Sequence, residues 1–306
     1  MASLTSARPS LAWSRPNVSA LAPITVVLVH RNSVESLSLT LNAFRAQTVA
    51  TQLLIVDNGS DGVVESSLRS LVEPDTLLAM GRNLGSGPGA NVGLRRWLRE
   101  SAGEWCAIAP HDAIPEPDTL EKILDAVKDR PFVGLVSADV GEPGRPIIEP
   151  FLGPIDAPAT GTGGFEIADY PHGTLMLVRR RCIEEVGIFD ERYFAYCEEA
   201  ELALRAAAAG WQSGIVRHAM VHNPSISISV ERIAYLQHRN TLLMLREHFG
   251  RWNAWFRIGM ALIQLSIGTV YPPARGLNWS PAGRLKGIRD YILGRYGPPA
   301  RDVGGD

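Results

Sequence analysis

Cysteine is scarce in this sequence, and the few cysteines it has lie far apart. Cys106, Cys182 and Cys197 are odd in number and include no CxxC pair. Neither a disulfide framework nor a structural zinc site is therefore indicated. The cysteine content fits a reducing, cytoplasmic setting.

An excess of charge of either sign is also lacking, and no secretory leader is expected at the N-terminus. The formal net charge is -2 over 306 residues, which gives no electrostatic reason to expect a nucleic-acid partner. Residues 1–22 are rich in serine, alanine and proline, and they lack the continuous apolar segment of a signal peptide. We expect them to form a flexible N-terminal arm.

One uncharged segment near the C-terminus is marginal as a membrane span. Residues 258–274 contain no formal charge, but Gln264 and the pair Pro272-Pro273 interrupt their apolar character. A bilayer span needs about 20 consecutive, predominantly apolar residues. The segment is therefore interpreted as a buried or interfacial helix.

What the sequence does contain is an alternation of short apolar blocks and amphipathic segments. Residues 34–44 show the three- and four-residue spacing of a helix. The apolar blocks are typical of strands buried on both faces of a parallel sheet, and they lie at 24–29, 53–56, 77–80 and 105–109. Strands that alternate with helices imply right-handed βαβ units. The predicted fold class is α/β, with a Rossmann-like, mostly parallel central sheet flanked by helices.

Three regions are expected along the chain. After the arm, residues 23–228 are predicted to form the α/β domain, in which 175–178 and 213–216 are the last clear strands. Glycine and proline are frequent up to Gly164, so the region before it is expected to be loop-rich and to line a variable pocket. Residues 229–306 are predicted to form a helical C-terminal region.

Polar side chains follow several of the predicted strands. Because open α/β sheets bind ligands at the carboxyl ends of their strands, Asn32, Asp57, Asn83 and Asp112 are expected to converge on one crevice. Asp57 fits two roles, an Asx-turn after its strand or a hydrogen bond to a nucleotide. Asp112 also fits two, a helix cap or a ligand for a divalent cation on a diphosphate.

Two other features are weak evidence for a site. The glycine-rich segment 81–89 has neither the first-strand position nor the GxGxxG spacing of a dinucleotide site, and it does not match a P-loop. Dinucleotide-dependent dehydrogenases and P-loop enzymes are therefore disfavoured. A lone histidine such as His222 is more often structural than a metal ligand, and the same holds for His30, His111 and His172.

An acidic segment is predicted to begin a helix that ends near residue 209. Carboxylates in the first turn of a helix are favoured by its macrodipole, which accounts for Glu198, Glu199 and Glu201 without any function. Glu201 has Arg205 one turn later and Glu198 lies on roughly that face, whereas Glu199 points elsewhere. A carboxylate without a local ion pair and beside aromatic residues has a raised proton affinity and can serve as a general base.

Five blocks of sequence are specific through their order and spacing. They are Val-Val-Leu-Val-His-Arg-Asn with Gln47 downstream; Ile-Val-Asp-Asn-Gly-Ser; Asn83-Leu-Gly with Asn91-Val-Gly93; Gly187-Ile-Phe-Asp-Glu-Arg-Tyr-Phe before Glu198-Glu199; and His222 with Arg239-Asn240. Together they resemble the family-two inverting glycosyltransferases of the GT-A fold, especially bacterial rhamnosyl and galactofuranosyl transferases. The resemblance spans about residues 23 to 248.

The resemblance implies a donor site, a base and an acceptor site within residues 23–228. The second acid of the family's acidic pair is its base, which corresponds to Glu199 here, one methylene longer than the common aspartate. Glu198 and His172, the latter in a loop placed like the family's acceptor loop, are expected to face the acceptor. The residues expected to bind the donor nucleotide sugar are His30, Asn32, Asp57, Arg82, Asn83 and Asp112.

The implied metal site departs from the family pattern. The family's DXD-type motif falls at residues 110–112, Pro-His-Asp, where proline replaces the first acid. Asp112, together with diphosphate oxygens and His222, is then expected to hold Mg²⁺ or Mn²⁺. Arg82, Arg239 and His222 are candidates to offset the charge of the leaving diphosphate.

The resemblance also implies a reaction and its partners. The base removes a proton from an acceptor hydroxyl, which attacks the anomeric carbon opposite the departing nucleoside diphosphate, so the configuration inverts. The expected donor is a UDP, dTDP or GDP sugar. The expected acceptor is a glycan, a lipid-linked sugar or a small molecule, and the expected process is assembly of a bacterial cell-surface polysaccharide.

Several alternatives stay open at this stage. The C-terminal region with Trp252, Trp255 and Arg257 either rests on the inner face of a membrane, as a peripheral contact, or packs in a homodimer. The lost acid at Pro110 and the glutamate at Glu199 also fit a catalytically silent nucleotide-sugar binding protein. A nucleotidyltransferase is a further rival, although no basic glycine-rich loop follows the first strand to bind a triphosphate.

Overall fold

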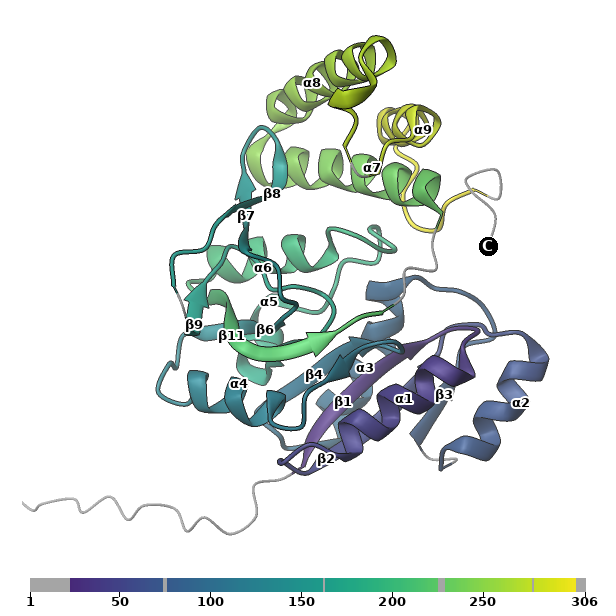
Figure 1. Cartoon of the computed structure of the whole chain (residues 1–306), viewed down its shortest axis with the longest axis vertical. Coiled ribbons are helices and arrows are strands. Elements are labelled where there is room, and N and C mark those ends of the chain that lie inside the picture. Colours follow the sequence, from purple (N-terminus) through teal and green to yellow (C-terminus); the bar gives the residue numbers. More distant parts are fainter. Residues whose placement is uncertain (1–22, 74–75, 162, 225–228, 277, 301–306) are drawn as a thin grey trace, which may run out of the picture.

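The protein is a central sheet covered by helices on both faces, with a further group of helices stacked at one end (Figure 1). The computed structural model describes residues 23–73, 76–161, 163–224, 229–276 and 278–300. The predicted N-terminal arm, residues 1–22, lies outside the described residues.

One mixed sheet forms the core of the fold. Its strands are β1 (Ile24–His30), β2 (Thr51–Asp57), β3 (Leu77–Ala79), β4 (Trp105–Pro110), β5 (Ile114–Pro115), β6 (Val133–Asp139), β9 (Gly164–Ile167), β10 (Met176–Arg179) and β11 (Gln212–His222). Their order is β3-β2-β1-β4-β10-β6-β11-β5, and β9 pairs with β11. The first four strands run parallel, whereas β10 lies antiparallel between β4 and β6. The predicted α/β class, with helices flanking the sheet, is confirmed.

The helices cover the two faces of the sheet because alternate strand side chains point to opposite sides. On β1, Val26 and Leu28 pack with one set of helices and Val27 packs with the other, and all three are fully buried. The first set is α1 (Val34–Arg45), α2 (Gly62–Leu71) and α4 (Thr119–Val127). The second set is α3 (Ser86–Glu100), α5 (Arg180–Val186) and α6 (Glu198–Ala208).

The region before Gly164 contains a β-hairpin, which corrects the expectation of a mainly loop-like segment. Its strands, β7 (Gly144–Glu149) and β8 (Gly153–Pro158), pair antiparallel as a separate two-stranded sheet. Proline is tolerated in such a ribbon because each strand has a free edge. Gly153 has φ of 87° at the turn, and a Cβ there would lie 2.4 Å from Thr241 Cγ2, so the hairpin packs closely on the following helical region.

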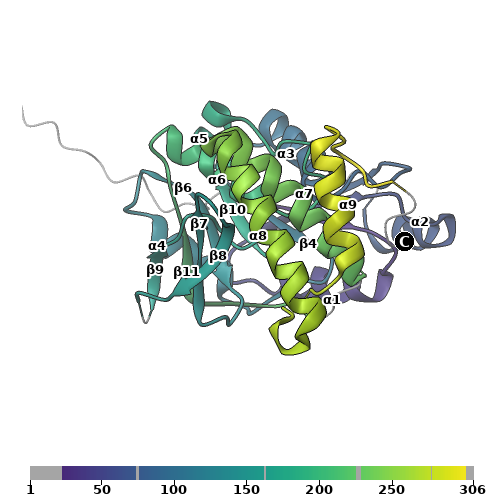
Figure 2. The ribbon, with the colours of Figure 1, turned by 90° about the horizontal axis from the view of Figure 1, so that it is seen from above.

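The C-terminal helices stack beyond the hairpin, as the view from above in Figure 2 shows. They are α7 (Val230–Phe249), α8 (Arg251–Val270) and α9 (Pro281–Ile292), with the short 3-10 turn η2 (Pro272–Ala274) after α8. Glycines let α9 approach α7, since a Cβ on Gly287 would lie 2.6 Å from Tyr235 O. Among the helices in the described residues, none has the length and apolar character needed to cross a bilayer.

Candidate active site

The strand register brings the predicted donor residues to one edge of the sheet. His30 at the end of β1 is in register with Asp57 at the end of β2, and Val29 is in register with Pro110 of β4. Asp57 is buried, and its Oδ1 accepts a hydrogen bond from Ser60 N at 3.2 Å. This hydrogen bond, received from three residues later, shows that Asp57 organises the turn after β2, whereas its contact with a nucleotide stays a prediction.

Asn32 joins the loops that follow β1 and β2. Its backbone has φ of 60°, in the left-handed region that asparagine tolerates better than most residues. Its N–H donates to Ser60 Oγ at 2.9 Å, and its Oδ1 accepts from Asp61 N at 3.0 Å. Because the side chain is exposed, Asn32 is accessible at the predicted donor edge.

Asn58 connects the end of β2 to the glycine-rich loop before α3, a role that the sequence analysis missed. Its Oδ1 accepts from Leu84 N at 2.8 Å, and its Nδ2 donates to Gly85 O at 2.9 Å and to Asn83 Oδ1 at 3.3 Å. Asn83 in turn accepts from Gly85 N at 2.9 Å. The turn-forming residues after β2 were visible in the sequence, but their partners 25 to 27 positions away were not.

Two further predicted donor residues, Arg82 and His30, lie in contrasting surroundings. Arg82 is exposed on the loop after β3. His30 is buried, and its ring packs edge-on against His111 at a centroid distance of 5.0 Å. Burial and the neighbouring His111 lower the pKa of His30 to about 3, so this imidazole is neutral at physiological pH. Its role in donor binding stays a prediction.

The predicted metal ligands do not form a complete protein-only site. Asp112 is buried just after β4, and His222 is exposed at the end of β11 with Nε2 3.8 Å from Glu116 Oε1. Within the described ranges, no group of three or more His, Cys, Asp or Glu side chains could hold a metal ion. The side chains alone therefore do not fit a resident metal, and we derive no catalytic step through one.

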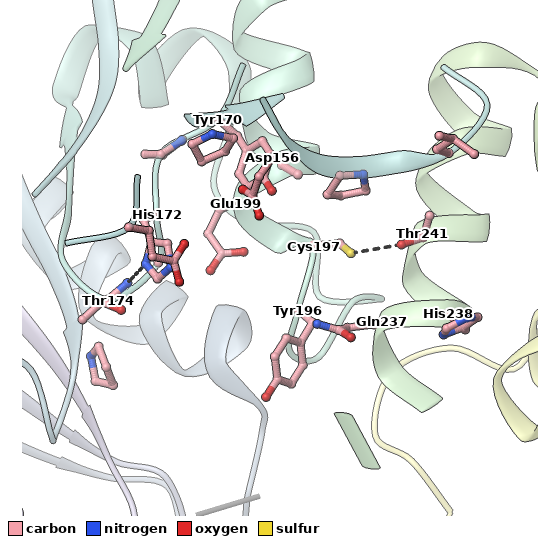
Figure 3. Close-up of a pocket in the computed structure, with 18 of the residues that line it drawn as sticks. Asp156, Tyr170, His172, Thr174, Tyr196, Cys197, Glu199, Gln237, His238 and Thr241 are labelled. Atoms are coloured by element: carbon pink, nitrogen blue, oxygen red, sulfur yellow. Dashed lines mark hydrogen bonds between the residues drawn. The ribbon is translucent and has the colours of Figure 1, made fainter. Parts of the chain in front are cut away.

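A pocket of about 520 Å³ opens beside the donor edge (Figure 3). Pro110 of β4 belongs to its wall, and so do residues from the β7–β8 hairpin, from the segment 170–174, from α6 and from the C-terminal helices. Glu199 reaches into the space between His172 and Tyr196. The predicted base and one of the two predicted acceptor residues therefore line the same pocket.

The two neighbouring glutamates at the start of α6 occupy different environments. Glu198 is buried near Ser86 and Gly87 of α3, away from the pocket, and its Oε2 has no hydrogen-bond partner in the described part of the chain. Burial and then the Glu199 charge raise the pKa of Glu198 well above its ordinary value, whereas burial raises the pKa of Glu199. Burial therefore favours the protonated form of both acids, and the Glu199 charge adds to this effect at Glu198.

Glu201 behaves as its helical position predicted. It receives hydrogen bonds from Arg205 Nε at 2.8 Å and Nη2 at 2.8 Å, one helical turn later. No ion pair to Glu199 is found among the described residues. Glu201 is therefore a structural acid, paired within its own helix, whereas Glu199 remains available in the pocket.

An unusual backbone positions the start of α6. Phe194, Tyr196 and Cys197 all have φ between 64° and 69°, which is costly for residues other than glycine. Asn240 of α7 holds this segment, since its Nδ2 donates to Tyr193 O at 2.7 Å, Ala195 O at 2.7 Å and Tyr196 O at 2.8 Å.

Arg239 belongs to the same support, and its suggested role in neutralising the leaving group is wrong. The side chain is fully buried, and its guanidinium donates to Asn240 Oδ1 at 3.0 Å, Tyr235 Oη at 3.1 Å and Gly297 O at 2.8 Å. A cation engaged in this way inside the protein cannot reach a diphosphate at the sheet edge. The Arg-Asn pair in the sequence carried no sign of these partners.

His172 is oriented for hydrogen bonding to a ligand in the pocket. Thr174 N donates to His172 Nδ1 at 3.3 Å, and burial lowers the pKa of the ring. A neutral ring whose Nδ1 accepts a hydrogen bond carries its proton on Nε2, which can donate to a ligand. The next residue is Gly173, where a Cβ would lie 1.9 Å from Glu199 Oε1, so only glycine leaves space for this carboxylate.

Comparisons with known proteins identify the family to which the chain belongs. The family model described as "Glycosyl transferase family 2" matches residues 25–187. N-acetylglucosaminyl-diphospho-decaprenol L-rhamnosyltransferase of Mycobacterium tuberculosis is 30% identical over 242 residues, covering 67% of this chain and 78% of that protein.

Solved structures share the fold at low sequence identity. GalNAc-T7, solved with UDP, GalNAc and Mn²⁺, has a TM-score of 0.62 and 11% identity, covering 88% of this chain and 54% of its own. The mannosyltransferase of Pyrobaculum calidifontis, solved with GDP-Man and Mn²⁺, has a TM-score of 0.53 and 16% identity, covering 90% of this chain and 88% of its own. With the family match over more than half of its length, the chain belongs to glycosyl transferase family 2 and is a glycosyltransferase.

Proposed function

We propose that this chain moves a sugar from a nucleoside-diphosphate sugar to an acceptor hydroxyl with inversion at the anomeric carbon. The observation that carries the proposal is the position of Glu199, a carboxylate without an ion pair among the described residues, in a pocket that reaches Pro110. Ligands of open α/β sheets bind outside the carboxyl ends of the strands. A donor at the end of β4 would therefore meet an acceptor beside Glu199.

The proposed chemistry is a single displacement. Ionised Glu199 accepts the proton of the acceptor hydroxyl, and the oxygen bonds to the anomeric carbon from the face opposite the diphosphate. The bond between that carbon and the diphosphate oxygen breaks, and its electron pair leaves with the nucleoside diphosphate. Glu199 then returns its proton to solvent. The raised pKa of Glu199 supports this role, since a base whose pKa lies nearer the working pH transfers protons more effectively.

The donor is proposed to bind along the edge formed by His30, Asn32, Asp57, Arg82, Asn83 and Asp112. The register of β1, β2 and β4 supports this placement. Arg82 is the exposed cation of this set that can approach the diphosphate. The side chains around His222 do not complete a metal site. A divalent cation, Mg²⁺ or Mn²⁺, would therefore be held by Asp112 together with oxygens of the donor's own diphosphate.

The substrate class follows from the relatives by analogy. The mycobacterial relative is named for an acceptor in which a sugar is joined through a diphosphate to decaprenol, and two structural neighbours were solved with GDP-Man or with UDP. We propose assembly of a cell-surface glycan, at the inner face of a membrane. UDP, dTDP and GDP sugars are the donors to screen.

The decisive experiment is Glu199→Gln, which keeps the side chain's shape but removes its basicity. Transfer should fall by roughly 10²- to 10⁴-fold, the usual contribution of a general base, while donor affinity measured by calorimetry stays nearly constant. Glu35→Gln, on an exposed turn of α1, is the matched control. Substantial residual transfer in Glu199→Gln would assign the proton to another group.

The same assay separates the rival functions. A nucleotide-sugar binding protein would bind the donor and release no nucleoside diphosphate with any acceptor. A nucleotidyltransferase would release pyrophosphate from a nucleoside triphosphate instead. Product analysis of the wild-type protein by phosphorus NMR distinguishes the three outcomes, and an inverted anomeric configuration in the product tests the displacement.

A further inference from the structure

Two arginines and a histidine meet where α7, α8 and α9 pack together at one end of the pocket. His238 of α7 and Arg257 of α8 line the pocket, and Arg284 of α9 lies close behind them. Burial and then the charges of Arg257 and Arg284 lower the pKa of His238 to about 4. Burial and the charge of Arg284 likewise lower the pKa of Arg257. The two arginines therefore repel each other, and their charges disfavour a proton on His238.

This cluster has no counter-charge among the described residues. Arg257 Nε donates to Leu152 O at 2.9 Å, but its Nη1 is buried without a hydrogen-bond partner in that part of the chain. Arg284 lies over the Trp279 ring at 4.8 Å, and its Nε is also buried and unpartnered there. Buried cationic donors without partners are costly, and the usual compensation is an anion.

His238 is the third member of the cluster, and a hydrogen bond to the backbone defines which of its ring nitrogens carries the proton. Its Nδ1 lies 3.0 Å from Ala234 O, to which a neutral ring donates, while its Nε2 is buried without a partner in the described ranges. A neutral ring then presents an acceptor at Nε2. A phosphate that arrives with a proton can donate to this nitrogen, and a phosphate dianion would raise the pKa of the ring by offsetting the two arginine charges.

The pocket is polarised along its length. Figure 3 shows Glu199 and Asp156 together on one side and His238 on the other, with Cys197 and Thr241 between them. Glu142 also lines the pocket. A ligand that presents a hydroxyl to Glu199 at one end and an anionic group to Arg257 at the other would match this charge pattern.

An apolar surface begins where the cationic cluster ends. Leu152, which accepts from Arg257, follows Phe151, and the Phe151 ring packs edge-on against Phe256 at 5.2 Å. Along α8 an exposed stripe continues at helical spacing, and its members are Trp252, Trp255, Phe256, Leu262, Ile263, Ile267 and Val270. An apolar chain attached to the anionic group would have a surface to follow from the pocket.

We propose that His238, Arg257 and Arg284 form an anion subsite of the acceptor pocket, which binds the phosphate or diphosphate of a lipid-linked acceptor sugar. The assignment rests on the proposed glycosyl transfer at Glu199 and adds the group that anchors the acceptor. The sugar hydroxyl then faces Glu199, the diphosphate faces the cations, and the lipid leaves over Phe151 and Phe256. Of the three residues of the proposed subsite, only Arg257 was noted from the sequence, and there for a different role.

The test compares acceptors that differ only in the anion. One acceptor is a sugar diphosphate with a short isoprenoid chain, and the other is the same sugar linked directly to the same isoprenoid alcohol, without phosphate. Arg257→Gln and Arg284→Gln should each raise KM for the first by roughly ten- to hundredfold, the loss expected for one charge-assisted contact, and leave KM for the second unchanged. An equal rise for both acceptors, or no rise for either, would overturn the proposal.

Two further comparisons sharpen the result. Arg251→Gln removes an exposed cation from the same helix outside the pocket and should leave both KM values unchanged. A loss in Arg251→Gln as large as in Arg257→Gln would instead indicate general attraction between charges and overturn the subsite. A sugar diphosphate without the isoprenoid chain should bind through the same arginines but more weakly, and equal binding would exclude the lipid from recognition.

Direct binding separates this proposal from the proposed reaction. Inorganic pyrophosphate should raise the melting temperature of the wild-type protein and of Arg251→Gln by more than that of Arg257→Gln/Arg284→Gln. This difference does not require transfer, so it supports the subsite even if no glycosyl transfer is detected. Transfer to the diphosphate acceptor that is indifferent to both arginines would overturn the subsite and leave the proposed function standing.

Discussion

The donor edge and the acceptor pocket are built in different ways. The donor edge collects residues that directly follow parallel strands, and the register of β1 with β2 and β4 aligns them. The pocket collects a hairpin, a strained turn and two C-terminal helices that are far apart in the sequence. The comparison teaches that one half of the site depends on sheet geometry, whereas the other depends on contacts between separate layers.

Support for the acceptor side is concentrated in Asn240, so among the residues that hold the two halves of the site its loss should have the largest effect. Asn240→Ala leaves the carbonyls of Tyr193, Ala195 and Tyr196 without this donor and releases the backbone before Glu199. Because small displacements of a catalytic group are costly, we expect kcat to fall by about 100-fold. Steady-state kinetics measures this loss, and donor affinity measured by calorimetry should stay within about twofold.

A matched control is Asn42→Ala, which removes an exposed asparagine from α1. It should leave kcat and melting temperature unchanged, whereas Asn240→Ala should also melt earlier because buried carbonyls lose their partner. If Asn240→Ala weakened donor binding as much as it lowered kcat, the two halves of the site would not be independent.

On the donor side, the corresponding change is Asn58→Ala, with a smaller expected effect. It removes the hydrogen bonds to Leu84 N and Gly85 O that hold the glycine-rich loop against β2. We expect the dissociation constant of the donor to rise by about tenfold, in line with the loss of one or two hydrogen bonds, with kcat little changed. Asn58→Asp keeps the acceptor for Leu84 N and should show part of this loss. A pure kcat effect would contradict the division into two halves.

The smallest effect is expected in the pH dependence of transfer. Burial raises the pKa of Glu199 above its ordinary 4.5, so the acidic limb of kcat/KM should have its midpoint above pH 4.5, with activity lost as pH falls through it. Glu199→Gln should remove this limb. A limb that persists unchanged in Glu199→Gln would belong to another group.

The same acids should affect stability with a defined sign. The folded protein holds the protons of Glu198 and Glu199 more tightly than the unfolded chain, where the ordinary value is 4.5. Their contribution to the free energy of unfolding is therefore largest at low pH and declines as pH rises above 4.5 through the folded pKa values. Glu198→Gln should reduce this decline, as melting temperatures across pH would show.

Much of the fold was predictable because its signals are local. The apolar blocks around Val26 and Ile55 indicated strands buried on both faces, and residues 34–44 showed the spacing of a helix. The hairpin β7–β8 was missed because prolines and glycines obscure its alternation and because it is stabilised by packing on α7. Local patterns thus indicated the elements with strong periodicity, but they did not indicate the hairpin, which is held by tertiary contacts.

The residues of the candidate site also differ in whether a local pattern in the sequence indicated their role. Helical geometry alone separated Glu201, paired with Arg205, from Glu199, and the structure agrees on that pair. The support from Asn240 and the cluster of His238, Arg257 and Arg284 had no local signature, because their partners are distant in the sequence. Arg239 was assigned to the wrong task for the same reason.

The sequence by itself therefore determined the order of the strongly periodic strands and helices, the polar residues at the strand ends and the acids at the start of α6, because each follows from local spacing. Only the tertiary structure decided which acid faces the pocket and which cations meet at its far end. Those outcomes depend on how α6, α7, α8 and the hairpin pack together, and packing brings together groups whose separation along the chain conceals them.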